Sequence, residues 1–182
     1  MPETDYAIRP ARVEELPALR EIERAAGKIF AEIGLEDVAN ASPLPLDFLE
    51  AQQHAGLVWV LTDTDDQPVG FAAASELDGA LYLEEIDVHP AHGRCGLGKW
   101  LIETLCVWAE EQGYPAVTLS TFRDVPWNAP FYSRLGFRII EDGEIGPGLQ
   151  ALLEHSARVW FPLVRVCMRR DLKTRQDKEI DV

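Results

Sequence analysis

Apolar residues recur every three or four positions in several stretches of the chain, which is the spacing of one helical face. The longest such stretch, "LGKWLIETLCVWAEEQG", ends at a glycine that is followed by Pro115, a typical helix stop. The pattern predicts helices over 13–27, 46–56, 97–112 and 128–136. Residues 28–45, between the first two of these helices, look like a loop or a broken helix.

Short runs rich in β-branched and aromatic residues predict strands between these helices. Two of the runs flank the polar turn "TDDQ" and predict a hairpin. The predicted strands cover 6–10, 57–63, 68–76, 80–88, 116–121, 137–140 and 158–170. Strands that begin as a hairpin and then alternate with helices indicate a mixed α/β or α+β sheet covered by helices. We expect one domain over 1–170 and a polar, disordered tail over 171–182.

Composition and charge narrow the class of protein. The 182 residues include 17 Lys and Arg against 31 Asp and Glu, a net charge of −14. This balance argues against nucleic-acid binding, which needs a basic surface, and it suits a cationic substrate, although acidity is commonly only solubility. Three cysteines without C-x-x-C spacing argue against a disulfide framework or a metal site and favour a reducing compartment. No membrane span or signal segment is apparent, so we expect a cytoplasmic protein.

The segment "HPAHGRCGLGKWL" concentrates glycine and positive charge in this acidic chain. It is not a P-loop, because Trp100 stands where a hydroxyl must bind magnesium. It is not a dinucleotide fingerprint either, because the order of its glycines is reversed. A glycine loop that leads from a strand into a long helix does suit phosphate, since the first amides of a helix are unpaired and partly positive. A glycine-rich turn without a ligand is the alternative.

Two segments resemble those of the Gcn5-related N-acetyltransferases, the GNAT family. "VHPAHGRCGLGKWLIETL" is similar to their acetyl-coenzyme A segment, commonly V-x-P-x-x-[QR]-x-x-G-x-[GA] before an apolar helix. "WNAPFYSRLGF" is similar to their later N-x-x-x-x-[FY]-Y-x-x-x-G-F segment, with one residue fewer between Asn and Tyr. The order of elements matches over residues 6–140. Gly93 departs from the pattern, because it stands at the usual Gln or Arg position and Arg94 follows it.

The resemblance implies a mixed, mostly antiparallel sheet with splayed middle strands and helices on both faces. It implies that acetyl-coenzyme A lies between these strands, with no metal. The pantetheine arm would bond to the backbone of Ile86 and Val88, and the pyrophosphate to the loop amides. The residues implied to bind the cofactor are Ile86, Val88, Arg94, Cys95, Gly96, Leu97, Gly98, Lys99 and Asn128. Asn128 has a second interpretation as the N-cap of the short helix.

Acetyl transfer to an amine requires two proton transfers. A lysine-like amine has a pKa of about 10.4, so a base must remove its proton, and the leaving thiolate, whose thiol pKa is about 8.5, needs an acid. Tyr132 matches the residue that usually acts as the acid in the family. The alternative is that its ring only packs the short helix on the sheet, but we expect the neighbouring Phe131 to do this packing. The candidate bases are Glu84 and Glu85, which point to opposite faces of one strand. Glu84 matches the base of relatives that acetylate polyamines, and carboxylates that merely contact solvent are the alternative.

These features predict an N-acetyltransferase that moves an acetyl group from acetyl-coenzyme A directly to a primary amine of a small molecule or peptide. Acceptor specificity is expected from 28–46 and 120–127, with Phe122, Asp124 and Trp127 as candidate wall residues. The family often forms dimers, so the resemblance allows a homodimer, but the sequence itself does not indicate the oligomeric state. The alternative function is a non-catalytic module that binds or senses acyl-coenzyme A.

Overall fold

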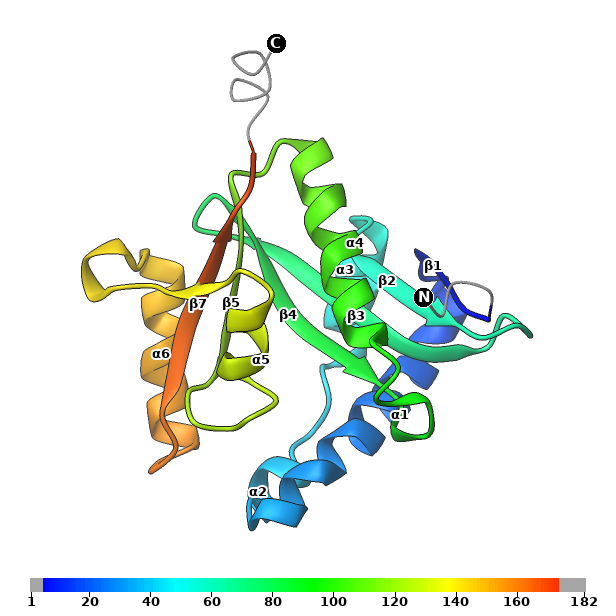
Figure 1. The fold of residues 1–182 in the computed structure, drawn as a ribbon, viewed down its shortest axis with the longest axis horizontal. Coiled ribbons are helices and arrows are strands. Elements are labelled where there is room, and N and C mark those ends of the chain that lie inside the picture. The colour runs from blue at the N-terminus through cyan, green and yellow to red at the C-terminus, as the bar shows by residue number, and fades with distance from the viewer. Residues whose placement is uncertain (1–4, 174–182) are drawn as a thin grey trace. The chain divides into compact units, whose positions relative to one another are not determined.

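The computed structural model describes residues 5–173, and Figure 1 shows its elements. The chain divides into two compact units. The first contains the chain up to Ala74 together with Glu85–Leu105, and the second contains Ser75–Glu84 and the chain from Cys106 onward.

The first unit is built from antiparallel strands and helices near the N-terminus. Its strands are β1 (Ala7–Pro10), β2 (Val58–Thr62), the first part of β3 (Pro68–Leu77) and the last part of β4 (Ala80–Val88). Its helices are α1 (Leu16–Gly27), α2 (Glu36–Ala39), α3 (Leu46–His54) and the start of α4 (Leu97–Gln112), with 3₁₀ turns at Val13–Glu15, Lys28–Ile33 and Pro90–His92. The stretch 28–45 is therefore a broken helix.

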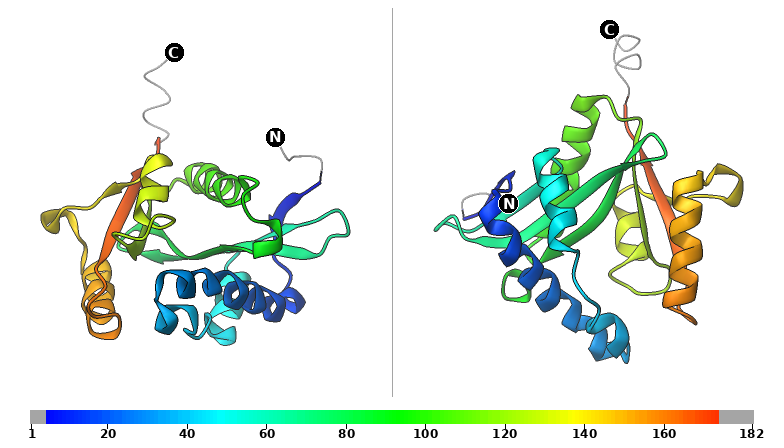
Figure 2. Two further views of the ribbon diagram at one scale, coloured as in Figure 1. Left: turned by 60° about the horizontal axis from the view of Figure 1, so that its bottom comes forward. Right: turned by 180° about the vertical axis from the view of Figure 1, so that it is seen from behind.

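The core of the first unit lies between the sheet and the two longer N-terminal helices. The apolar face of α1 packs against α3 and against alternate residues of β2 and β3, and Figure 2 shows these helices on the opposite side of the sheet from the start of α4. The fully buried side chains of this core include Leu16, Leu19, Leu49, Val60 and Phe71. Burial of each large apolar side chain contributes about 2 kcal/mol.

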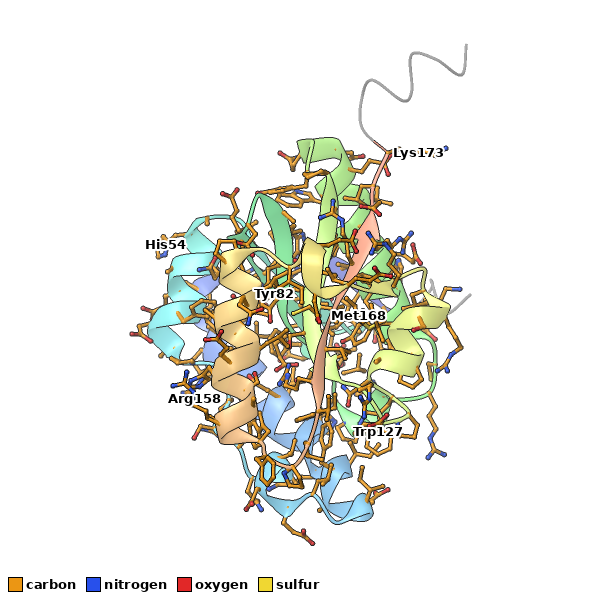
Figure 3. All side chains as sticks on the ribbon, turned by 90° about the vertical axis from the view of Figure 1, so that its left-hand side faces the viewer. His54, Tyr82, Trp127, Arg158, Met168 and Lys173 are labelled. Carbon is orange, nitrogen blue, oxygen red and sulfur yellow. The ribbon has the colours of Figure 1, made fainter. Side chains whose placement is uncertain are left out.

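The second unit contains the C-terminal strands and two further helices. It is built from β5 (Ala116–Phe122), β6 (Arg138–Ile139), β7 (Arg165–Asp171), α5 (Ala129–Arg134), α6 (Pro147–Val159), a 3₁₀ turn at Asp142–Glu144 and the adjoining parts of β3, β4 and α4. β7 pairs antiparallel with both β5 and β6. Figure 3 shows α6 and α5 on opposite sides of β7, with Tyr82 near α6. Tyr82 forms a buried cluster with Ile140, Leu149 and Cys167.

The strand order β1-β2-β3-β4-β5-β7-β6 makes a seven-stranded mixed sheet. The one parallel pair among the described strands, β4 with β5, covers only Leu81 to Leu83 of β4. β4 and β5 thus pair only near the start of β4, as expected for splayed middle strands. The mixed sheet with its helices confirms the predicted fold class. Within residues 5–173, no helix is long and apolar enough to cross a membrane.

The predictions for the C-terminal part need correction. The last strand begins at Arg165 rather than at residue 158, because α6 continues to Val159 and Pro162, in the segment that follows, cannot donate to a ladder. Residues 147–159 form a helix where no element was predicted, although Leu149, Leu152 and Leu153 stand at helical spacing. Asp171 belongs to β7, and residues 174–182 of the predicted tail lie outside the described residues.

Candidate cofactor and catalytic site

The glycine loop of the first unit leads from β4 into the 16-residue helix α4. Arg94 and Gly96 adopt the left-handed backbone conformation, with φ of 66° and 79°. Such a conformation turns successive amides toward one side, which suits an anion. Leu97 is only 2% exposed and anchors the start of the helix, whereas Arg94 to Gly96 and Lys99 are exposed. The loop is therefore exposed and carries two positive side chains beside the start of a long helix.

Residues from other parts of the chain contact the segment where this loop begins. The hydroxyl of Tyr6 lies 3.0 Å from Nδ1 of His92, and the His89 amide donates to the Val69 carbonyl at 2.7 Å. His89 Nδ1 accepts from the amide of Ala91 at 3.2 Å. Both histidines are half-buried and fix the turn. Tyr6 lies 86 residues from His92 in sequence, and no local pattern indicated the contact.

Gly93 has a structural explanation. A Cβ at this position would lie 3.2 Å from the Pro90 carbonyl oxygen, tighter than most side chains tolerate. The residue that the family pattern places here would therefore crowd the 3₁₀ turn. Arg94, one position later, is exposed.

The two candidate bases differ in their surroundings. Oε1 of Glu84 accepts a hydrogen bond from Ser75 Oγ at 2.6 Å. Burial raises the pKa of Glu84, and the Ser75 bond partly offsets this rise. Oε1 of Glu85 accepts from the amide of Ile86 at 3.1 Å, and Asp87 lies close enough for the two carboxylates to repel each other. Ser75 was not foreseen, because its bond to Glu84 depends on the pairing of separate strands.

Tyr132 is the buried aromatic residue of α5, at 9% exposure. Its ring packs edge-on against Phe131, at 5.4 Å between centroids, and Phe137, at 5.8 Å. The expectation that Phe131 does the packing in its place is wrong, because Phe131 is the more exposed of the two. Tyr132 thus has a structural role, and its role as an acid stays a prediction.

Asn128 stands at the N-cap position of α5, but its side chain does not cap the helix. Its backbone carbonyl accepts from the amides of Phe131 and Tyr132, at 2.8 and 3.1 Å. Its side-chain oxygen Oδ1 is buried, and no group in the described part of the chain donates to it. The capping interpretation is therefore wrong for the side chain, and Oδ1 stays available for a donor from a ligand.

The three candidate wall residues of the acceptor site differ in their exposure and contacts. Phe122 is buried, lying edge-on to Trp160 and below the guanidinium of Arg165, so it is a packing residue more than an open wall. Asp124 is exposed and pairs with Arg123. Trp127 is half-buried and lies in the lower right part of the view in Figure 3.

The predicted site residues fall into two groups. The first unit brings together Glu85, Ile86, Val88 and the loop from Arg94 to Lys99. The second unit contains Glu84, Asn128 and Tyr132. No group of three or more His, Cys, Asp or Glu side chains within residues 5–173 has the geometry of a metal site.

The family assignment rests on a comparison with known families. Residues 17–137, which include the glycine loop and α5, match the model of the Acetyltransferase (GNAT) family. The chain belongs to the GNAT family of acetyltransferases. The resemblance in the glycine loop and in "WNAPFYSRLGF" is thereby confirmed at the level of the family.

Solved structures with the same fold support this GNAT assignment. The ribosomal-protein-S18-alanine N-acetyltransferase of Escherichia coli is 19% identical with a TM-score of 0.66, over 93% of this chain and 95% of that one. The PaiA N-acetyltransferase of Thermoplasma acidophilum, solved with coenzyme A, is 17% identical with a TM-score of 0.65, over 91% and 98%. A GNAT acetyltransferase of Staphylococcus aureus is 20% identical with a TM-score of 0.68, over 92% and 99%. At these identities the likeness shows the fold.

Proposed function

We propose that this GNAT protein transfers an acetyl group from acetyl-coenzyme A directly to a primary amine. The observation that carries the proposal is the exposed loop before α4, where Arg94 and Gly96 have left-handed backbone and the side chains of Arg94 and Lys99 add positive charge. Helix starts of this kind bind phosphate groups well. Family membership and the complex of the Thermoplasma relative with coenzyme A support the same ligand.

The cofactor would be held largely by backbone groups. The amides from Arg94 to Lys99 would bind the pyrophosphate, and the backbone of Ile86 and Val88 would bond to the pantetheine arm as a neighbouring strand does. The buried Oδ1 of Asn128, for which the described residues offer no donor, suits a contact with an amide of that arm. Acetyl-coenzyme A supplies the activated acyl group, and this chain orients the group and moves the protons.

Glu84 is our preferred base. It is partly buried, its pKa is raised, and Ser75 fixes its carboxylate, so it combines a defined position with basicity closer to neutral pH. Glu85 stays the second candidate. Tyr132 is our preferred acid for the leaving thiolate, since its hydroxyl belongs to a ring held rigidly by two neighbours.

A thiol-release assay across a panel of primary amines tests the proposal. We expect turnover with at least one amine, and a fall of about a hundredfold in kcat for Tyr132→Phe with little change in coenzyme A affinity. Tyr114→Phe is the matched control, because Tyr114 bonds to Glu76 and is assigned no catalytic role. Unchanged turnover in Tyr132→Phe would remove this residue from the mechanism.

The pH profile tests Glu84. Because the base must be ionised, kcat/KM should fall as the pH decreases through the raised pKa of Glu84, and Glu84→Gln should lower kcat about a hundredfold. The same assay separates an enzyme from an acyl-coenzyme A sensor. Tight coenzyme A binding without thiol release from any amine would favour the sensor.

A further inference from the structure

Gly70 of β3 is buried, and its surroundings leave no room for a side chain. A Cβ at this position would lie 2.8 Å from the carbonyl oxygen of Asp87, closer than Cβ atoms come to other atoms in proteins. Methyl groups of Leu61 and Val88 would lie 3.1 and 3.3 Å away. The φ of Gly70 is outside the left-handed region, so glycine is required here by the close approach of another backbone.

This close approach coincides with an irregularity in the ladder between β2 and β3. Leu61 pairs with Gly70 and Thr62 pairs with Pro68, so the register skips Val69. One extra residue of this kind is a β-bulge, which bends the strand locally and changes the direction of its backbone groups. The carbonyl of Val69 accepts from the amide of His89 at 2.7 Å, and this bond holds the end of β4 against the bulge.

The hydrogen bond of His89 indicates which edge of β4 each backbone group faces. Successive residues of a strand direct their N–H and C=O groups to opposite edges. The His89 amide faces β3, so the backbone groups of Asp87 face β3 as well. Those of Ile86 and Val88 therefore face the other edge, where pairing with β5 has already ended. In agreement with this, the amide of Ile86 donates to a side-chain oxygen, Oε1 of Glu85, at 3.1 Å.

The Asp87 carbonyl and the Val88 amide belong to one peptide unit. Such a unit is planar and trans, so its C=O and N–H point in opposite directions and move together. The oxygen of this unit faces Gly70, and its N–H therefore points to the edge away from β3. The space left by the missing side chain of Gly70 thus determines where the Val88 N–H lies.

We propose that Gly70 is a positioning residue for coenzyme A. Because β3 can approach the Asp87 carbonyl at this glycine, the Val88 N–H lies where a carbonyl of the pantetheine arm accepts from it. This inference rests on the proposed binding of acetyl-coenzyme A along Ile86 and Val88. It adds a residue that touches no ligand and that lies outside both segments of the family resemblance.

The displacement expected from a side chain at residue 70 is large for a hydrogen bond. Ordinary contacts of a Cβ begin at 3.4 Å, so Gly70→Ala must separate the new methyl group and the Asp87 oxygen by about 0.6 Å. Rotation of a side chain cannot relieve this contact, because the oxygen belongs to the backbone. The strength of a hydrogen bond depends steeply on its distance and angle, so the bond from Val88 should weaken.

The experiment measures two affinities of Gly70→Ala by calorimetric titration, one for coenzyme A and one for adenosine 3′,5′-bisphosphate. The bisphosphate has the nucleotide part of coenzyme A and lacks the pantetheine arm. We expect the affinity for coenzyme A to fall about tenfold, the effect of one lost hydrogen bond. The affinity for the bisphosphate should change by less than about twofold. A general loss of structure would instead lower both affinities.

Gly148→Ala is the matched control. A Cβ at Gly148 would lie 2.5 Å from Leu77, so this substitution is at least as crowded, but Gly148 lies in the first turn of α6 in the second unit. It should keep both affinities even where it lowers stability. Equal losses for both ligands in Gly70→Ala, or a similar loss for coenzyme A in Gly148→Ala, would overturn the inference.

Nuclear magnetic resonance of the wild type provides a second measurement in case Gly70→Ala does not fold. In isotope-labelled protein, the amide resonance of Val88 should shift when coenzyme A binds and stay unchanged when the bisphosphate binds. The amide of Asp87, which faces β3, is the internal reference and should shift little with either ligand. A Val88 resonance that is insensitive to coenzyme A would contradict the proposed placement.

Thiol release separates this inference from the proposed function. If the wild type releases thiol with an amine while Gly70→Ala loses both ligands equally, acetyl transfer stands and the role of Gly70 is rejected. If only the coenzyme A affinity falls but no amine releases thiol, Gly70 keeps its role in a protein that binds coenzyme A without transferring the acetyl group. Absence of coenzyme A binding in the wild type would reject both.

Discussion

The starts of α4 and α6 pose the same physical problem and have opposite solutions. Each helix follows a glycine-containing segment, and each leaves amides in its first turn without intrahelical partners. At α6, the carboxylate of Asp78 accepts from the amides of Gly148 and Leu149, both at 2.9 Å. At α4, the first turn has no acidic residue and carries Lys99. One helix start is completed by the chain's own anion, and the other is suited to an anion from outside.

The space around the glycines at the starts of α4 and α6 differs in the same way. A Cβ at Gly146 would lie 2.5 Å from the Asp78 carboxylate, and one at Gly148 would lie 2.5 Å from Leu77. A Cβ at Gly96 meets nothing within 4 Å, and that glycine is instead required by its φ of 79°. Glycine at α6 therefore allows protein to approach closely, whereas glycine at α4 sets the shape of an open loop.

Among substitutions at the two helix starts, the largest expected effect comes from Gly96→Val. Left-handed backbone costs an L-residue about 1–2 kcal/mol, and branching at Cβ adds to this cost. We expect coenzyme A affinity, measured by calorimetric titration, to fall by about thirtyfold, or about 2 kcal/mol. Gly56→Val is the matched control, because Gly56 has φ of 75° in equally open space beyond α3. It should lose similar stability and keep its affinity; equal affinities in both variants would refute the assigned role of the loop.

Asp78→Ala should have the next largest effect, on stability rather than on binding. Loss of a helix cap typically costs about 1–2 kcal/mol, and here two amides lose their acceptor. Urea unfolding should show a decrease of about 1.5 kcal/mol in the free energy of unfolding, with unchanged coenzyme A affinity. Asp124→Ala removes an exposed carboxylate whose only described ion pair is on the surface, and it should cost less than about 0.5 kcal/mol. A variant of Asp78 as stable as the wild type would contradict the capping role.

Lys99→Glu should change stability and binding in opposite directions. A carboxylate in the first turn of α4 complements the helix dipole and should add about 0.5 kcal/mol to the free energy of unfolding. The same charge repels an anionic ligand, so coenzyme A affinity should fall about tenfold, and more at low salt. Lys99→Gln should lie between the two. An affinity unaffected by the charge at residue 99 would place the pyrophosphate elsewhere.

The sequence was informative where the determining residues are neighbours in the chain. The glycine spacing predicted the loop and the start of α4, and period-two alternation separated Glu84 from Glu85. The loop and the two faces of the strand need only local geometry, so they could be predicted. The apolar spacing of Leu149, Leu152 and Leu153 is also local, but the glycine and polar residues around it weaken the pattern, and no helix was predicted there.

Contacts between distant segments could not be predicted in this way. Asp78 caps a helix that begins about 70 residues later, and Tyr6 reaches a histidine 86 residues away. The proximity of Glu23 to Asp87 depends on how α1 packs on the sheet. The pKa of each carboxylate follows from such packing, so the sequence offered candidate bases without distinguishing their environments.

The dihedral angles of the loop before α4 also bear on how relatives of this protein can be recognised. If the ligand is bound mainly through main-chain amides, selection acts on which residues tolerate φ near 70° and hardly on what their side chains present. Divergent members can then exchange the long polar side chain of the family pattern, as Gly93 illustrates here, without losing the binding surface. A profile that scores conformational tolerance at these positions would detect distant members that a comparison of side chains overlooks.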